Sequence, residues 1–109
     1  MADQNKADQI VHAAAILADA VNTKQTLEDN RIHVKMDAID RIMASGDNPA
    51  TGKAWSFSAA EAVVNTDEEY ADYLAQIRDA VREEIIARGA YMATLVGLYT
   101  ADKDSVENV

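Results

Sequence analysis

The apolar positions in the first half of the chain repeat at helical spacing. Two runs follow the same steps of four, three and four residues: Ile10, Ala14, Leu17 and Val21, then Ile32, Met36, Ile39 and Met43. Such steps place side chains on one face of an α-helix. The step of 11 residues between the two runs makes three turns, so one straight helix keeps both runs on the same face. We predict a helix over residues 6–44, ending where Gly46 provides a C-terminal signal.

A second apolar stripe begins after residue 66. It is interrupted only by Arg88 and consists of Tyr70, Leu74, Ile77, Val81, Ile85, Met92, Leu95 and Tyr99. This stripe predicts a long helix over residues 67–100. Thr66 and Glu69 match a capping box, in which a hydroxyl and a carboxylate accept hydrogen bonds from free backbone amides at a helix start. Residues 101–109 have no periodicity and are expected to fray.

The strongest loop signal lies between the two stripes. The only proline, Pro49, is flanked by Gly46 and Gly52, which predicts a loop over residues 45–57. Ser58 and Glu61 match a further capping box and predict a short helix over residues 58–64.

These elements predict an all-α fold in a single domain over residues 1–109. The architecture is an antiparallel long-helix hairpin with a short helix in the connection. A lone hairpin covers its two narrow apolar stripes poorly. We therefore expect it to associate into a helical bundle, as a homo-oligomer or on a protein partner.

Composition narrows the classes of function. The 109 residues include no cysteine, which excludes a disulfide framework, a thiolate zinc site and a cysteine nucleophile. Nineteen acids against ten bases give a net charge of −9, so direct binding to nucleic acid is not expected. No apolar run approaches the ~18 residues of a membrane span, and the N-terminus lacks the pattern of a signal peptide. We expect a cytoplasmic protein that does not bind membranes.

Two segments resemble ligand sites only in part. From Gly46 to Ala54 the spacing is one residue too long for a phosphate-binding loop, and Ala54 replaces the hydroxyl that would hold magnesium. His33 shares a helix face with Asp29 and Asp37, but one helix supplies an incomplete metal shell and the chain has no Glu-x-x-His motif. We therefore predict no cofactor and no metal, and interpret the two segments as a polar loop and a solvated face.

The acids around the start of the second long helix have a structural explanation. They are Glu61, Asp67, Glu68, Glu69 and Asp72. Carboxylates favour the positive end of a helix dipole and cap free amides. We interpret them as capping residues rather than as acid–base catalysts, and we predict no catalytic residues.

Two large aromatic residues lie in the predicted connection. Trp55 and Phe57 are the only Trp and Phe of the chain. They can close the open end of the hairpin, or with Lys53 they can form a contact for a partner, because aromatic anchors dominate many interfaces.

Polar residues interrupt both apolar stripes. Gln25 and Glu28 lie on the first stripe and Arg88 on the second. They mark a weakly packed middle, or they fix the register by pairing across the bundle, with Arg88 meeting the acids.

The connection also resembles a known group of proteins. Asn48-Pro49-Ala50-Thr51-Gly52-Lys53 is followed by Ser58-Ala59-Ala60-Glu61 and later by Glu69-Tyr70. This order is similar to that in small helical accessory proteins of tailed phages and prophages. The resemblance covers about 25 residues. It implies a phage accessory protein in the host cytoplasm, and it supplies no catalytic residues.

Three hypotheses of function follow. The first is a non-enzymatic helical interaction protein of phage or prophage type. The second is an acidic inhibitor or nucleic-acid mimic that occupies a basic groove of a nucleic-acid-binding complex, for which net charge gives weak support. The third is a metal- or nucleotide-dependent helical enzyme.

Overall fold

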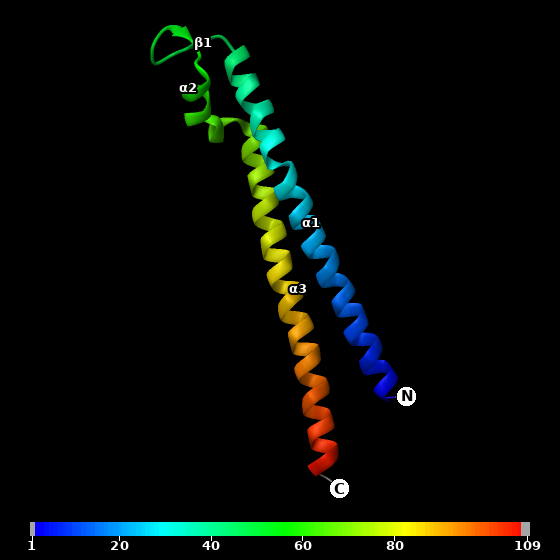
Figure 1. Cartoon of the computed structure of the whole chain (residues 1–109). Helices are drawn as coiled ribbons and strands as arrows, with labels where there is room; N and C mark the ends of the chain where they lie inside the picture. The colour runs from blue at the N-terminus through cyan, green and yellow to red at the C-terminus, as the bar shows by residue number, and fades with distance from the viewer. Residues whose placement is uncertain (1, 108–109) are drawn as a thin grey trace. The chain divides into compact units, whose positions relative to one another are not determined.

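A computed structural model of the chain describes the backbone of residues 2–107 and the side chains of residues 4–97. In chain order the elements are α1 (Ala2–Ala44), β1 (Asp47–Asn48), β2 (Lys53–Ala54), α2 (Phe57–Ala62), the 3₁₀ turn η1 (Val64–Thr66) and α3 (Glu68–Glu107) (Figure 1). The predicted fold class is confirmed, since two long helices form an antiparallel hairpin with a short helix between them.

The chain divides into two compact units where we predicted one domain. We name Met1–Gln25 with Ala80–Val109 the terminal unit, and Thr26–Asp79 the loop unit. Each unit contains a segment of α1 and a segment of α3. In two long antiparallel helices, each segment contacts only the segment of the other helix that lies beside it. Residues far apart along the helices therefore share no common core.

The long helices differ from their predicted bounds mainly at the ends. α1 begins before residue 6 and stops at Ala44, as predicted, two residues before Gly46 adopts a φ of +124°. α3 begins at Glu68 and continues past the predicted end at residue 100 to Glu107. Residues 101–107 contain neither glycine nor proline, so nothing in the sequence ends the helix there. Residues 108–109 of the predicted tail lie outside the described part of the chain.

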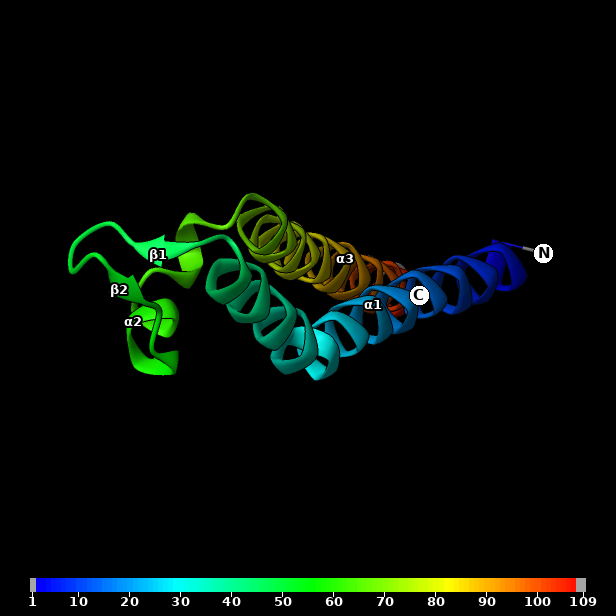
Figure 2. The same ribbon diagram turned by 90° about the horizontal axis from the view of Figure 1, so that it is seen from above.

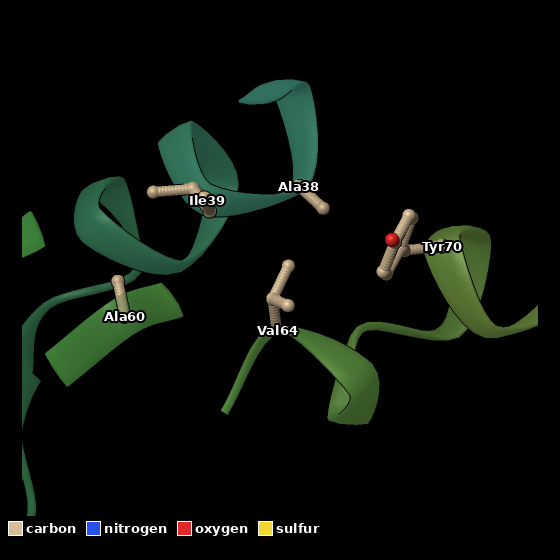
Figure 3. Close-up of a cluster of buried hydrophobic side chains, with 5 residues drawn as sticks. All are labelled: Ala38, Ile39, Ala60, Val64 and Tyr70. Carbon is tan, nitrogen blue, oxygen red and sulfur yellow. The ribbon is translucent and has the colours of Figure 1, made fainter. Parts of the chain in front are cut away.

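The core of the loop unit combines all of its helices. Its buried members are Ala38, Ile39, Ala60, Val64 and Tyr70 (Figure 3). Ile39 and Tyr70 are the largest fully buried side chains. Half-buried residues pack around this cluster, namely Val34, Ile42, Trp55 and Leu74. The connection therefore completes the core by covering α1 with α2 and η1.

The predicted face of α1 is wrong in the loop unit, with Ile39 as the exception. Ile32, Met36 and Met43 are exposed, at 57%, 38% and 39% of their surface. We predicted that they face inward because, in a straight helix, a residue 11 positions after Val21 lies on the same face as Val21.

The observed inward positions of α1 follow a different period. Leu27 and Val34 are half-buried and Ala38 is fully buried, in steps of seven and four. This is the heptad spacing of two helices in continuous contact, which drifts away from the face of a straight helix by about 20° per heptad. In the terminal unit the predicted first run agrees better with the structure, since Ile10, Ala14, Leu17 and Val21 are all half-buried.

The predicted loop contains a small antiparallel sheet. Its two strands are β1 and β2 (Figure 2). Asp47 lies opposite Ala54, and Asn48 lies opposite Lys53. The tip that joins these strands is residues 49–52.

The tip has the residues that its conformation demands. The Asn48 carbonyl accepts from the amides of Thr51 and Gly52 at 3.1 and 2.7 Å, while its side-chain oxygen accepts from the Ala50 amide at 3.0 Å. Pro49 presets the first turn position, and Gly52 has a φ of +70°. The loop signal of the sequence is therefore a preorganised turn.

The short helix begins at a different cap from the predicted one. Ser56, with extended backbone, accepts from the Ala59 amide at 3.1 Å through its hydroxyl oxygen. Ser58 instead lies in the first turn of α2, which ends at Ala62 and is followed by η1. Ser58 has the better capping sequence because Glu61 follows it, but packing of Trp55 on the core favours the start at Ser56.

The cap of α3 is shifted by one residue. Asp67, rather than Thr66, accepts from the Tyr70 amide, at 2.9 Å. The Thr66 hydroxyl donates to the Val63 carbonyl at 2.6 Å and so belongs to η1. Asp67 is the last residue with extended backbone before α3, which is the geometry that an N-cap requires.

Candidate interaction surface

The three residues predicted to bind a partner lie in the loop unit, and they differ in exposure. Trp55 is half-buried and packs against the core cluster, as expected of a residue that closes the end of the core. Its indole Nε1 is buried and has no hydrogen-bond partner within residues 4–97. Phe57, at the start of α2, is 44% exposed, and Lys53 on β2 is exposed. Lys53 and Phe57 are thus accessible to a partner, whereas Trp55 serves the core.

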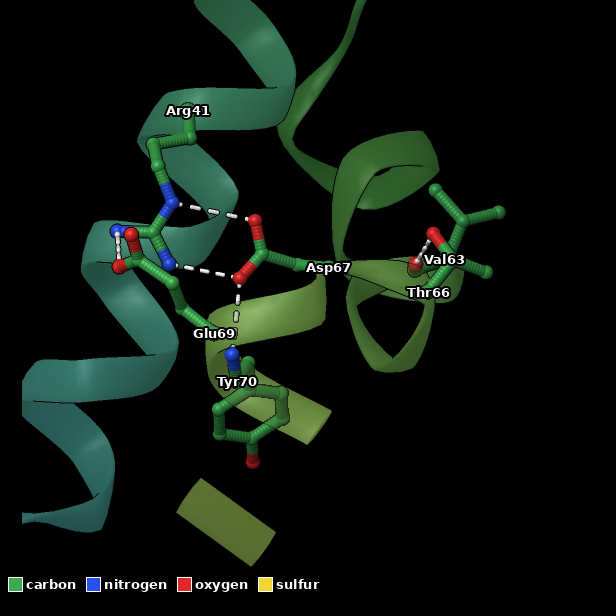
Figure 4. A network of polar contacts seen from close by, with 6 residues as sticks. All are labelled: Arg41, Val63, Thr66, Asp67, Glu69 and Tyr70. Atoms are coloured by element: carbon green, nitrogen blue, oxygen red, sulfur yellow. Dashed lines mark hydrogen bonds and ion pairs between the residues drawn. The ribbon is translucent and has the colours of Figure 1, made fainter. Parts of the chain in front are cut away.

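An arginine joins α1 to the start of α3. Arg41 donates from Nε to Oδ1 of Asp67 at 3.1 Å and from its second terminal nitrogen to Oδ2 at 2.7 Å (Figure 4). Its other terminal nitrogen lies 3.2 Å from Glu69. The hydrogen bond from Arg41, assisted by the Tyr70 amide, lowers the pKa of Asp67. Asp67 is therefore both the cap of α3 and the bidentate partner of α1.

Further polar contacts link the elements of the loop unit. Lys35 on α1 lies 3.5 Å from Glu61 on α2. Arg31 donates from Nε to the Tyr70 hydroxyl oxygen at 3.4 Å, and this bond raises the pKa of Arg31. The Tyr73 hydroxyl donates to the Leu27 carbonyl. Three of the clustered acids, namely Glu61, Asp67 and Glu69, thus have structural partners.

The polar contact between the long helices involves residues that the sequence interpretation missed. Lys24 on α1 donates to Oε2 of Glu84 on α3 at 2.8 Å, and the two side chains are 24% and 13% exposed. Of the three polar residues that the sequence singled out, Arg88 forms an ion pair of 3.5 Å with Glu84 of its own helix. The other two, Gln25 and Glu28, are exposed.

Heptad spacing is the signal that could have found this pair. Lys24 follows Leu17 by seven residues, and Glu84 follows Ile77 by seven. The hydrogen bond from Lys24 lowers the pKa of Glu84, with a smaller contribution from Arg88.

The terminal unit exposes large apolar side chains on both helices. The exposed set, which we name the apolar surface, consists of Val11, Ile16, Ile85, Ile86, Met92 and Val96. The only buried residues among 4–25 and 80–97 are Ala80 and Ala87. Ile85 and Met92, predicted to face inward, are 64% and 54% exposed, which corrects that part of the second stripe.

The inward side of α3 in this unit follows the heptads rather than the predicted stripe. Glu84, Tyr91 and Leu95 are half-buried, and Ala87 is buried. The side chain of Tyr99, the last member of the predicted stripe, lies outside the described residues.

A groove follows α1 and α3 within the terminal unit. Its volume is about 290 Å³, and its wall includes Ala13 and Ile16 of α1 and Ala87 and Ala90 of α3. Gln9 and Thr94 are shared with a neighbouring hollow of about 400 Å³, which reaches Ala93 and Gly97. Thr94 also lines the groove, and its hydroxyl donates to the Ala90 carbonyl at 2.8 Å.

Charge is distributed unequally between the two units. The described residues of the terminal unit, 4–25 and 80–97, carry four acids and four bases. The loop unit, residues 26–79, carries eleven acids and five bases. Residues 1–3 and 98–109 add four acids and one base, so the whole terminal unit has a net charge of −3 and the loop unit a net charge of −6.

The described residues form neither a metal centre nor a membrane-spanning helix. No group of three or more His, Asp or Glu side chains there, including those around His33, is arranged to hold a metal ion. None of the helices, over the same residues, has the length and apolar content needed to cross a membrane.

Comparison with protein-family models, curated proteins and solved structures found no match to this chain.

Proposed function

We propose that the chain is a non-enzymatic helical interaction protein that binds a protein partner through the apolar surface of its terminal unit. The observation that carries this proposal is the composition of α3 over residues 85–97. This stretch contains one charged residue, Arg88, yet large apolar side chains on it are exposed.

Helical spacing explains why one partner helix is insufficient for α3. Ile85, Met92 and Val96 follow steps of seven and four, which place them together on one face. Ile86 and Ala90 lie on a different face, and Ala87 and Tyr91 face α1. A helix that is apolar around its whole circumference is characteristic of the interior of a bundle. Complete burial of a fully exposed Ile or Met side chain contributes about 1.5–3 kcal/mol, so covering several of these side chains offsets part of the cost of association.

The charge balance favours a protein as the partner. A helix that lies on a membrane has a face rich in Lys and Arg, and a surface that binds nucleic acid needs an excess of the same residues. The terminal unit has equal numbers of acids and bases in its described residues. Contact with another apolar protein surface requires no charge excess.

The resemblance of residues 48–70 to small phage accessory proteins implies nothing about the mode of action. A role in a phage or prophage, within the host cytoplasm, is part of our proposal for this chain. Lys53 and Phe57 provide a second accessible contact in the loop unit.

Affinity capture with matched variants tests the proposal. The immobilised wild-type chain is compared with the double variant Ile85→Gln and Met92→Gln, and with the double variant Ile32→Gln and Met36→Gln as a control. Both pairs replace exposed Ile and Met on a long helix, the first in the terminal unit and the second in the loop unit. We expect the first variant to lose the proteins that wild type and control retain. Equal capture by all three chains would contradict the proposal.

The acid excess of the loop unit favours a second candidate function, an acidic inhibitor or nucleic-acid mimic. We rank it second because Arg41 and Lys35 pair with Asp67, Glu69 and Glu61 and divide the carboxylates. Contacts between exposed charges weaken strongly as salt rises from about 0.1 to about 0.5 M. A partner affinity that falls steeply over this range would favour the mimic, and an affinity that does not fall would remove it.

A further inference from the structure

We infer that the groove of the terminal unit is occupied by the same groove of a second copy of this chain, which forms a twofold-symmetric helical bundle. This inference goes beyond the proposed function, because the groove residues of α3, namely Ala87, Ala90 and Thr94, lie on another face of the helix than Ile85, Met92 and Val96.

Self-association through a twofold axis needs a surface that complements itself. Each copy must present both projecting side chains and spaces that accept them, because residue i of one copy contacts residue j of the other and the reverse. The groove meets this requirement. Its wall combines the small residues Ala13, Ala87 and Ala90 with Gln9, His12 and Thr94, and Ile16 projects at its side. Ile86, which is 57% exposed, precedes Ala90 by one helical turn and provides a second projection.

Electrostatic repulsion between two copies is weaker at the terminal unit than at the loop unit. Two copies of a chain with a net charge of −9 repel each other. The described residues of the terminal unit contribute no net charge, whereas the loop unit has six more acids than bases. A contact through residues 4–25 and 80–97 therefore joins the copies where acids and bases are equal in number, although the whole terminal unit carries a net charge of −3.

The available area is that of a stable interface. The α1 segment over residues 4–25 is about 33 Å long, and two adjacent helices are about 20 Å wide. The face of the unit is therefore about 650 Å², close to the roughly 600–1,000 Å² that each partner contributes to a typical specific interface. Three of the seven residues that line the groove, Ala13, Ala87 and Ala90, are small, which lets helices approach closely at these positions.

Sedimentation velocity on the purified chain tests the inference directly. We expect wild type to sediment at twice its mass of 11.8 kDa at micromolar concentration. Ala90→Glu places a carboxylate in the groove and should weaken the dimer by at least about 100-fold. Ala18→Glu makes the same chemical change at another exposed alanine of the unit, one that does not line the groove, and should leave the dimer intact.

Far-UV circular dichroism identifies a variant that fails to fold. If Ala90→Glu loses helicity, Ala90→Leu replaces it, since leucine is a strong helix former that fills the groove without charge. That variant should weaken the dimer by at least about 10-fold. An Ala90 variant that folds and dimerises as tightly as wild type would overturn the inference.

The outcomes separate this inference from the proposed function. A monomeric wild-type chain whose capture of proteins depends on Ile85 and Met92 overturns the second copy as occupant and retains the proposed function. A monomeric chain whose capture is unaffected by those residues overturns both. A dimer that resists Ala90→Glu and yields to Ala18→Glu places the contact on another face and also overturns the inference.

Discussion

Lys24 on α1 and Glu84 on α3 form an ion pair of 2.8 Å at positions where the two helices face each other. Heptad spacing places apolar residues at such positions in most helix pairs. A polar pair there contributes less stability than packed leucines would, but it specifies which residues meet. In the terminal unit, where the buried residues are small alanines, this pair defines the alignment of the helices.

The ion pair predicts a pH dependence of stability. Lys24 holds the pKa of Glu84 below 4.5, so the folded protein binds fewer protons than the unfolded chain as pH falls past that value. The contribution of Glu84 is therefore complete above 4.5 and is lost as pH falls through the lowered pKa. We expect Glu84→Gln to be less stable than wild type to urea at about pH 7, and the difference to shrink as the pH falls below 4.5 and through the lowered pKa. Glu83→Gln, at an exposed neighbour, is the control with little effect. A difference that is constant with pH would contradict the assignment.

Two isoleucines on α1 predict opposite responses to the same substitution. Ile39 is fully buried, whereas Ile32 is 57% exposed. Ile39→Ala should lower the free energy of unfolding by about 2–4 kcal/mol, because it opens a cavity beside Ala60 and Val64. Ile32→Ala should change it by less than about 1 kcal/mol. Urea denaturation measures both, and equal losses would show that the assigned face of α1 is incorrect.

Asp67 has two roles that a pair of variants can separate. Asp67→Ala removes both the cap of α3 and the partner of Arg41, and should cost about 1–2 kcal/mol. Asp67→Asn keeps a good capping oxygen but loses the charge, so its stability should lie between that of Asp67→Ala and wild type. Asp72→Ala, at an exposed site on α3, is the control. Identical stability of the Ala and Asn variants would contradict the capping role.

The glycines at 52 and 89 predict effects of opposite sign. Both positions have open space for a β-carbon. Gly52 has a φ of +70°, so Gly52→Ala strains the backbone and should cost about 1 kcal/mol. Gly89 lies within α3, where alanine is favoured over glycine by about 0.8–1 kcal/mol, so Gly89→Ala should raise the melting temperature. Destabilisation by Gly89→Ala would show that residue 89 is packed closely in the assembly.

The helices were predictable from sequence because their apolar period is clear. Which side of each helix is buried was harder to predict. Hydrophobicity ranks Ile32 above Ala38, yet Ala38 is buried and Ile32 is exposed. A small residue at the contact lets two helices approach closely, and this preference depends on the neighbouring helix rather than on the residue itself. The period of 3.6 and the heptad period of 3.5 diverge with length, so the prediction worsened along α1.

The candidate contacts show the same limit. Trp55 fits both a core residue and a partner anchor by residue type, and only its packing on the core cluster separates the two interpretations. Lys24 and Glu84 were overlooked because an apolar pattern passes over charged residues, although their heptad positions were available in the sequence. Ser56 and Ser58 are alternative caps two residues apart, and tertiary packing selects between them.

Thiol labelling at residue 90 measures most directly whether the apolar groove is covered. The chain has no cysteine, so Ala90→Cys and Ala18→Cys each carry a single reactive group at a residue that is exposed in one copy. Our account predicts that residue 90 reacts at least about 10-fold more slowly than residue 18 at high protein concentration, and that the two rates converge on dilution as the dimer dissociates. Equal rates at every concentration would contradict it.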